Sequence, residues 1–415
     1  MKSAIRPTLA FLAAASLAAC ASSERPRVTP ETTPPAAAPT FSMQPVRFAD
    51  VPGWGSADLA PALAAFRRQC TSWRARGADA QVGANARYGG RVADWLPACS
   101  AADSAAPGQE RAFFEANFTP NMVVSQNGQA RLTAYYEPSI QVSRTPAPGM
   151  TEALRPRPND MITVDVAAFA QAYDSETLRG APRTLTGRLE GDRVRPYPSR
   201  AEITQNAGPA IAYANPVDVY NLQVQGSGRI VFADGAQRRA AFSAQNGYRW
   251  RSAIGAARES GQLPEGAGTW RGFRSWMDGL PADRQRAVLN ADQSYVFFED
   301  QAIADPSIGP RGAANVHLTP QGSMAVDPAF HPYGALIFVD ATYEGGAFRR
   351  LMVAQDTGGA IRRGPLRGDV FWGSGPEAGQ AAERMNADAP RFWTLVPRNA
   401  NTPVAALDTD ARTAR

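Results

Sequence analysis

Apolar residues recur at three- and four-residue steps between Leu59 and Cys70, near the start of the chain. This spacing places them on one side of a helix, and it predicts a helical region from Ala57 to about Trp95. Shorter helices are predicted around Gln109–Asn117, Val164–Tyr173, Ser252–Ser260, Pro281–Asn290 and Pro376–Asn386. Apart from its short helix, the Pro- and Arg-rich stretch from Arg144 to Pro198 predicts loops.

Alternating and β-prone residues predict strands elsewhere. LTAYYEP, at residues 132–138, predicts a strand that Pro138 ends, because proline has no amide hydrogen for a sheet ladder. Residues 217–235 alternate apolar and polar side chains and predict a β-hairpin that ends at the Asp234-Gly235 turn. Gln223 and Gln225 would then share one strand face, where amides suit hydroxyl and acetamido groups. Further strands are predicted at Ser294–Phe298, Ala335–Val339, Phe348–Ala354, Val370–Trp372 and Phe392–Val396.

Two aspartates, Asp356 and Asp369, stand beside the last strand-forming runs. Residues 351–379 read LMVAQDTGGAIRRGPLRGDVFWGSGPEAG, with several glycines between the two acids. Glycine permits a tightly turned backbone, so this stretch is suited to bring backbone and carboxylate close to a ligand. A surface loop with two solvated aspartates is the alternative that the stretch alone leaves open.

The N-terminus predicts export. Lys2 and Arg6 precede an apolar segment, Leu9–Ala19, that is too short to span a bilayer as a mature helix. The segment ends in LAAC, which resembles a bacterial lipoprotein signal with Cys20 as the lipidated residue; an ordinary signal peptide is the alternative. No aspartate follows Cys20 directly, which favours the outer membrane by resemblance to sorted lipoproteins. Residues 21–41 are rich in Pro, Ala, Ser and Thr and predict a disordered tether.

Composition disfavours several kinds of chemistry. The 415 residues carry a net charge of +5, nearly all of the positive charge is arginine, and no basic run indicates nucleic-acid binding. The two histidines, His317 and His331, stand near no Gly-x-Ser-x-Gly motif, which disfavours serine-triad hydrolysis and histidine-based metal catalysis. Asp356-Thr357-Gly358 matches the aspartic-protease triplet, but that class needs two such carboxylates. No metal and no cofactor are expected.

The two other cysteines, Cys70 and Cys99, would meet an oxidising compartment after export. They are candidates for a disulfide, which would stabilise the fold by about 3 to 4 kcal/mol on the chain-entropy estimate. Two buried free thiols are the alternative.

A carboxyl acid working among aromatic and amide side chains remains as candidate chemistry. A protonated carboxyl can donate to the leaving oxygen of a glycosidic bond, but an ordinary aspartate has a pKa of ~3.9 and needs a desolvated setting to hold its proton. Asp369 has the more apolar flank in Val370-Phe371-Trp372. It is therefore predicted to be the acid, and Asp356 to support it.

Several segments together resemble the membrane-bound lytic murein transglycosylase A family. They are LTAYYEP, LQVQGSGRIVFADG, NGYRWRSAIG, SYVFF, LMVAQDTGGAI and GDVFWGSGPEAG, and they cover most of the chain from about residue 115 to 398. The resemblance implies a mainly β fold with α+β elements and N-terminal helices. A double-psi β-barrel would be formed by residues 42–137 and 299–400, with a β-rich substrate-binding domain inserted at 138–298. Residues 401–415 would form a tail.

The resemblance also implies roles for single residues. Asp369, in GDVFWG, aligns with the family's catalytic aspartate, and Asp356, in QDTGG, with a supporting one. Asp369 would protonate the oxygen between N-acetylmuramic acid and N-acetylglucosamine and then accept the proton of the muramoyl C6 hydroxyl, which leaves a 1,6-anhydro ring. The candidates for sugar contacts are Thr133, Tyr136, Gln223, Gln225, Ser227 and Trp372, each of which has an ordinary sheet or core position as its alternative.

The expected partners follow from this resemblance. They are peptidoglycan glycan strands, the outer membrane through the lipid on Cys20, and cell-wall synthesis or lysis complexes. The protein is expected to be a monomer in the Gram-negative periplasm and to bind no nucleic acid. Two other functions stay open: a non-catalytic wall-binding lipoprotein, and a muramidase that uses water and leaves a reducing end.

Overall fold

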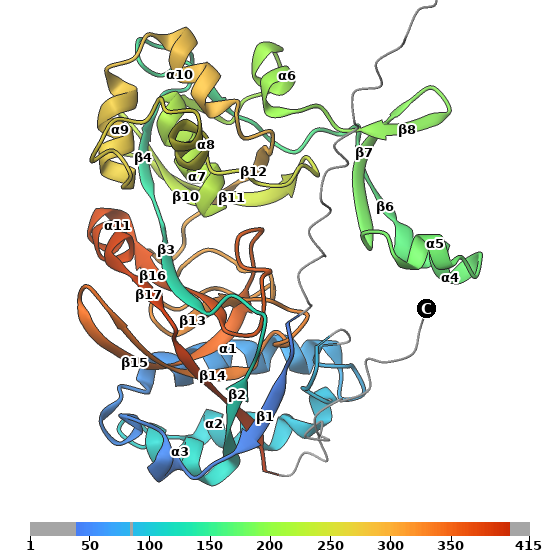
Figure 1. Ribbon diagram of the computed structural model, residues 1–415, viewed down its shortest axis with the longest axis vertical. Coiled ribbons are helices and arrows are strands. Elements are labelled where there is room, and N and C mark those ends of the chain that lie inside the picture. The colour runs from blue at the N-terminus through green and yellow to red at the C-terminus, as the bar shows by residue number, and fades with distance from the viewer. Residues whose placement is uncertain (1–38, 84–85, 399–415) are drawn as a thin grey trace, which may run out of the picture. The chain divides into compact units, whose positions relative to one another are not determined.

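The computed structural model describes residues 39–83 and 86–398, a mixed α/β fold with several sheets (Figure 1). The largest sheet in this part of the chain has nine strands. In spatial order they are β1 (Ser42–Pro45), β2 (Phe118–Val124), β18 (Arg391–Pro397), β14 (Leu336–Tyr343), β15 (Gly346–Asp356), β13 (Ser323–Val326), β16 (Arg367–Ser374), β3 (Arg131–Glu137) and β17 (Asn386–Asp388).

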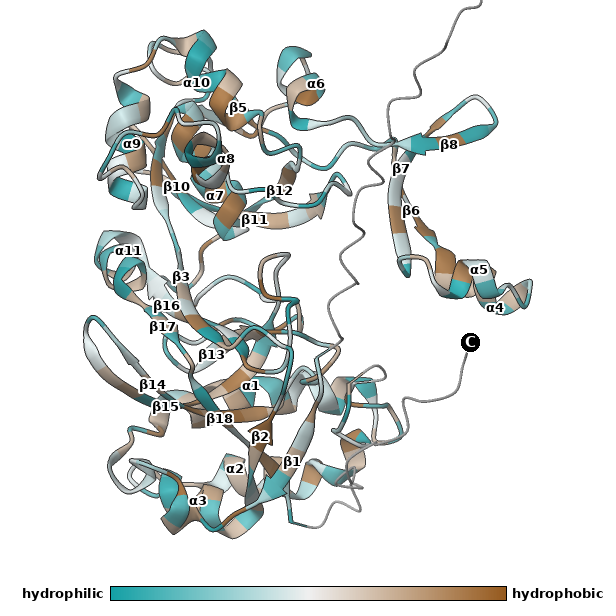
Figure 2. Ribbon diagram, in the orientation of Figure 1, coloured by the Kyte–Doolittle hydropathy of each residue, from teal (hydrophilic) through white to brown (hydrophobic). Residues whose placement is uncertain are grey.

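The pairing in this sheet mixes both directions. β13 runs parallel to β15, and β16 runs parallel to β3, whereas the other neighbours are antiparallel. The sheet therefore joins strands that precede residue 138 with strands that follow residue 322. Hydrophobic colours concentrate on β2, β14 and β18 (Figure 2), as expected for strands buried on both faces.

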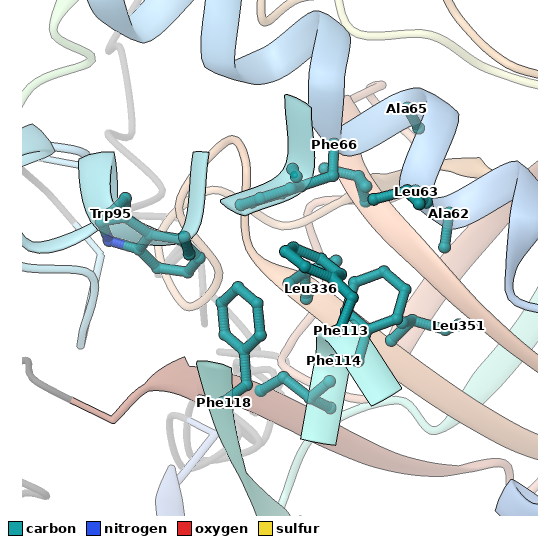
Figure 3. Packing of buried hydrophobic residues seen from close by; sticks show 14 of the residues in the cluster. Ala62, Leu63, Ala65, Phe66, Trp95, Phe113, Phe114, Phe118, Leu336 and Leu351 are labelled. Atoms are coloured by element: carbon teal, nitrogen blue, oxygen red, sulfur yellow. The ribbon is translucent and has the colours of Figure 1, made fainter. Parts of the chain in front are cut away.

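Three helices pack against this sheet. They are α1 (Ala60–Arg76), α2 (Leu96–Ser104) and α3 (Glu110–Asn117), and short 3-10 helices, η1 (Phe48–Asp50), η2 (Trp54–Ser56) and η3 (Val92–Asp94), lie before α1 and before α2. Figure 3 shows Phe66 of α1 and Phe118 of β2 in the aromatic core between them, with ring centroids 5.6 Å apart. A disulfide between Cys70 and Cys99 ties α1 to α2.

The predicted helical region from Ala57 to Trp95 is correct only to Arg76. Gly77 has a φ of 87°, which ends the helix. Further glycines follow at Gly83, Gly89 and Gly90, and the chain runs through turns before α2 begins. By contrast, α3 confirms the predicted helix at Gln109–Asn117 within one residue.

A second sheet lies in the middle of the sequence. Its four strands, in spatial order, are β12 (Val296–Ala302), β11 (Gln237–Gln245), β10 (Gly228–Phe232) and β4 (Ser139–Val142). The chain enters it directly from β3 through Pro138 (Figure 1). Around it lie α7 (Pro216–Gln225), α8 (Ala253–Glu259), α9 (Trp270–Asp278) and α10 (Ala282–Leu289), of which α8 and α10 confirm predicted helices and α9 was not predicted.

The predicted hairpin at residues 217–235 is wrong in its first half, which is helix α7. Asn215 caps the helix by accepting a hydrogen bond from the Val217 amide, Pro216 occupies its first turn, and Gly226 ends it with a φ of 84°. These start and stop signals outweigh the alternation of apolar residues. The hairpin lies one strand later, where β10 and β11 flank the turn at Asp234-Gly235.

The stretch predicted as loops between Arg144 and Pro198 contains strands. β6 (Met161–Asp165), β7 (Thr184–Glu190) and β8 (Arg193–Pro196) form a three-stranded sheet, and β5 (Glu152–Leu154) pairs with β9 (Ala212–Ala214). The predicted short helix is confirmed as α4 (Val166–Ala172), followed by α5 (Glu176–Arg179) and, after this stretch, by α6 (Arg200–Gln205). β7 and β8 were missed because their side chains are largely exposed and lack an apolar run.

The predicted strands of the last region are confirmed as β14, β15, β16 and β18. The predicted final helix is α11 (Gly375–Arg384). Within the described residues, no helix combines the length and the apolar character needed to cross a bilayer. Cys20, most of the predicted tether and the predicted tail at 401–415 lie outside the described residues.

Candidate active site

The two predicted acids lie in one row across the nine-stranded sheet. Ala325 on β13 is the register partner of Asp356 on β15 and of Asp369 on β16, and Thr133 on β3 is the next partner beyond Asp369. Directly paired residues in neighbouring strands point to the same face of a sheet. The carboxyl groups therefore share a face, with backbones two strand spacings apart, roughly 10 Å, and with Ala325 on the strand between them.

Asp369 is held from one side. The Thr133 hydroxyl donates to its Oδ1 at 2.5 Å, and Arg367 Nη2 donates to the Thr133 hydroxyl at 2.8 Å. Burial raises the pKa of Asp369 to about 6; the Arg367 charge and the Thr133 hydrogen bond oppose the rise, and the Asp356 charge adds to it. Part of the residue remains accessible. Asp369 can therefore carry a proton near neutral pH and still meet a ligand.

Asp356 is held from both sides. Its Oδ1 accepts hydrogen bonds from the backbone amides of Ala313 and Thr357 at 3.0 and 2.9 Å, and its Oδ2 accepts one from the Tyr135 hydroxyl at 2.7 Å. Burial raises the pKa of Asp356 above its ordinary value, although these three hydrogen bonds oppose the rise. A carboxylate whose two oxygens are both engaged is suited to hold a fixed position and charge.

Tyr135 links the strands that carry the acids. It follows Thr133 by two residues on β3 and so lies on the same face, and its hydroxyl reaches Asp356 across β16 and β13. Its ring packs against Phe371, with centroids 5.4 Å apart. Burial and the neighbouring Asp356 charge raise the pKa of Tyr135 far above its usual value, so it stays a hydrogen-bond donor.

A buried ion cluster fixes the ends of β3 and β16. Glu137 accepts hydrogen bonds from Arg229 Nε at 3.0 Å, Arg239 Nε at 2.5 Å and Ser374 Oγ at 2.6 Å. Both arginines come from the four-stranded sheet, on β10 and β11. This cluster ties that sheet to the strand that bears Asp369.

Comparison with known proteins gives this arrangement a context. Residues 131–299 match the family described as MltA specific insert domain, and residues 322–396 match the 3D domain. The crystal structure of membrane-bound lytic murein transglycosylase from Agrobacterium tumefaciens is 30% identical, with a TM-score of 0.72, over 86% of this chain and 98% of that one. The chain belongs to the MltA family.

Further relatives agree with this assignment. MltA from Neisseria gonorrhoeae is 26% identical, with a TM-score of 0.70, over 90% of this chain and 99% of that one. Membrane-bound lytic murein transglycosylase A of Escherichia coli K12 is 32% identical over 210 residues, which are 48% of this chain and 56% of that protein. The chain thus spans little more than half the length of this curated relative.

Two of the predicted sugar contacts meet where α7 faces β3 of this MltA-family chain. The Tyr136 amide donates to Gln225 Oε1 at 3.2 Å, and the Tyr136 hydroxyl accepts from Asn221 Nδ2 at 3.2 Å. The Tyr136 ring lies against Gly379 of α11, where a Cβ would come within 2.8 Å of it. Both predicted residues keep some exposure.

The other predicted contacts lie elsewhere. Gln223 is buried on α7, where it accepts from Arg200 and donates to the Val296 carbonyl, so it does not share a face with Gln225 as the hairpin prediction required. Ser227 is buried and accepts from the Phe242 amide. Trp372 packs against Phe348 and Tyr343, and alternation along β16 turns it away from the face of Asp369.

Three residues of the site were not predicted: Tyr135, Ala325 and Arg367. A sequence signal exists for two of them, because Tyr135 and Arg367 stand two residues from Thr133 and Asp369 on the same strands, which places each pair on one face. Within the described residues, no group of three or more His, Cys, Asp and Glu side chains is placed to hold a metal ion.

Proposed function

We propose that this protein is a lytic transglycosylase. It would cleave the β-1,4 bond between N-acetylmuramic acid and N-acetylglucosamine in peptidoglycan and leave 1,6-anhydromuramoyl ends during cell-wall turnover. The observation that carries the proposal is the asymmetry of the two acids. Asp369 has a pKa of about 6 and one oxygen without a protein partner among the described residues, whereas Asp356 is saturated. Membership of the MltA family supports the reaction type.

A single acid is sufficient for this reaction. Asp369 donates its proton to the glycosidic oxygen as the C1–O bond breaks, and the N-acetylglucosamine leaves with a free C4 hydroxyl. The resulting carboxylate accepts the proton of the muramoyl C6 hydroxyl while that oxygen bonds to C1. Asp369 ends protonated, no water is consumed, and no second catalytic carboxylate is needed.

The surrounding residues would position substrate and acid. Thr133 and Tyr135 would hold the carboxyl groups of Asp369 and Asp356 in place through their hydrogen bonds. Tyr136 and Gln225 offer polar atoms to a glycan where α7 meets β3. Gln223 and Ser227 are buried and would support the residues around them through their hydrogen bonds. A sugar contact of Trp372 stays a hypothesis. A crystal structure of E. coli MltA carries bound chitohexaose, which supports a glycan substrate.

The domain organisation and cellular location are part of the same proposal. We infer a double-psi β-barrel from residues 42–137 and 299–400 with residues 138–298 inserted; the nine-stranded sheet, which joins strands within 42–137 to strands within 323–397, supports this division. Lipidation of Cys20 would hold the protein at the outer membrane on the periplasmic side. Relatives named as membrane-bound support an envelope location.

Digestion of purified sacculi followed by mass spectrometry of the products tests the function. Wild-type protein is expected to release 1,6-anhydromuramoyl ends, and Asp369→Asn to release almost none. Reducing muramic acid ends would instead identify a muramidase. Binding of sacculi without cleavage, unchanged in Asp369→Asn, would identify a wall-binding lipoprotein.

A further inference from the structure

Arg367 lies two residues before Asp369 on β16 and reaches it through the Thr133 hydroxyl. Its Nη2 donates to Thr133 Oγ1 at 2.8 Å, and Thr133 Oγ1 lies 2.5 Å from Asp369 Oδ1. Arg367 also donates to the carbonyls of Arg131 and Gly368, which hold its guanidinium in place. The chain of contacts thus runs from a fixed cation, through one hydroxyl, to the acid.

The direction of each hydrogen bond follows from the groups involved. A guanidinium only donates, and a threonine hydroxyl has one proton to give. Since Thr133 Oγ1 accepts from Arg367, its own proton points to Asp369 Oδ1. Asp369 keeps this bond when its proton is on Oδ2. A proton on Oδ1 would instead have to be donated to the second lone pair of Thr133 Oγ1, and the Thr133 proton would lose the acceptor that it has in this structure. The arrangement therefore favours Oδ2 as the site of the transferable proton.

Oδ2 of Asp369 is also the accessible oxygen. Among the described residues, no protein group donates to it, and it is not one of the buried side-chain atoms that lack a partner, which are Trp73 Nε1, Arg155 Nε and Asp292 Oδ2. An atom that has no partner and yet is not buried is open to solvent. The oxygen that carries the proton is thus the one that a ligand can reach.

We propose that Arg367 is a positioning residue that orients the Thr133 hydroxyl and so places the proton of Asp369 on Oδ2, toward the substrate. This inference rests on the proposed transglycosylase function. The guanidinium has a second role in the same reaction, because its charge stabilises the carboxylate that must exist between the two proton transfers.

Other charged groups around Asp369 act on the same titration. Asp356 on β15 raises its pKa and Arg367 lowers it. Arg131 on β3 and Arg363 in the preceding loop act on Arg367, and Tyr135 on β3 remains neutral beside both acids. Arginine stays charged in this setting. Removal of Arg367 should therefore raise the pKa of Asp369.

A double-mutant cycle on the full-length protein tests the inference. Arg367→Met and Thr133→Val are each expected to lower kcat for anhydromuramoyl formation about tenfold or more, with KM changed much less. Each is also expected to move the alkaline limb of the pH profile upward, by about one unit for Arg367→Met. In the Thr133→Val background, Arg367→Met should lower kcat by a clearly smaller factor than in the wild-type background, because the route through the hydroxyl is already lost and only the effect of the guanidinium charge remains. Arg67→Met is the matched control, since Arg67 also binds backbone carbonyls, those of Ala102 and Ala105, and it should keep wild-type kinetics.

Independent, multiplicative losses in the double mutant would overturn the inference, as would an unchanged kcat in Arg367→Met. If Arg367→Met does not fold, the comparison of Thr133→Ser with Thr133→Val decides: serine keeps the hydroxyl and should retain most activity, and equal activities would refute the relay. A wild-type protein that forms no anhydromuramoyl ends would refute the proposed function instead, so the two failures are distinguishable.

Discussion

Asp356 and Asp369 occupy equivalent positions on either side of Ala325, yet their surroundings differ. Three donors engage both oxygens of Asp356, whereas one donor engages one oxygen of Asp369. Burial raises the pKa of both; three hydrogen bonds oppose the rise at Asp356, whereas one hydrogen bond opposes it at Asp369, whose pKa reaches about 6. Two aspartates in one row thus acquire different tasks through the number of donors around them.

Asp369→Asn is the change with the largest expected effect. The amide keeps the shape and the contact with Thr133 but has no proton to transfer, so the rate of anhydromuramoyl formation should fall by about 10²- to 10⁴-fold. Release of soluble muropeptides from sacculi measures this. Asp340→Asn is a matched control, because Asp340 lies on β14 of the same sheet and is paired with Arg349 and Arg391. Equal losses in both variants would assign the effect to the fold.

Asp356→Asn should have an intermediate effect. It removes a negative charge that raises the pKa of Asp369, so that pKa should fall and the alkaline limb of the activity profile should move to lower pH. A fall of one unit would reduce the protonated fraction at neutral pH about tenfold. A loss as large as that of Asp369→Asn, without a shift of the limb, would contradict the division of tasks.

Tyr135→Phe should have the smallest effect. It removes one hydrogen bond to Asp356 and is expected to lower the free energy of unfolding by about 1 kcal/mol. Asp356 would then be less firmly ionised, so the alkaline limb should move in the same direction as in Asp356→Asn, but less. Thermal unfolding and the pH profile measure the two effects, and a shift toward higher pH would show that Tyr135 acts on Asp369 by another route.

The sequence was sufficient to predict the parts of the site that lie within single strands. The apolar runs around Asp356 and Asp369 predicted β15 and β16, and LTAYYEP predicted β3 with its end at Glu137. It could not show that β13 lies between the two acids, because the order of strands in a sheet depends on pairing between distant segments. Ala325 was missed for that reason.

The α7 region shows the opposite case. The apolar positions Leu222 and Val224 fit a strand, but Gln223 between them is buried and Val224 is exposed, which a strand with that apolar face would not give and a helix does. Asn215-Pro216 before the run and Gly226 after it were the better local signals. Arg367 was missed because its role depends on Thr133, 234 positions away.

The pH dependence of kcat/KM for anhydromuramoyl formation by the wild-type protein tests the central claim most directly, because it reports the acid of the free enzyme. Asp369 must be protonated to act, and its pKa is about 6, so activity should fall about tenfold per unit as pH rises above that value. Asp356→Asn should move the midpoint of this fall to lower pH. A midpoint near 4, as for an ordinary aspartate, or a profile that stays flat through pH 6 and 7 would contradict the account.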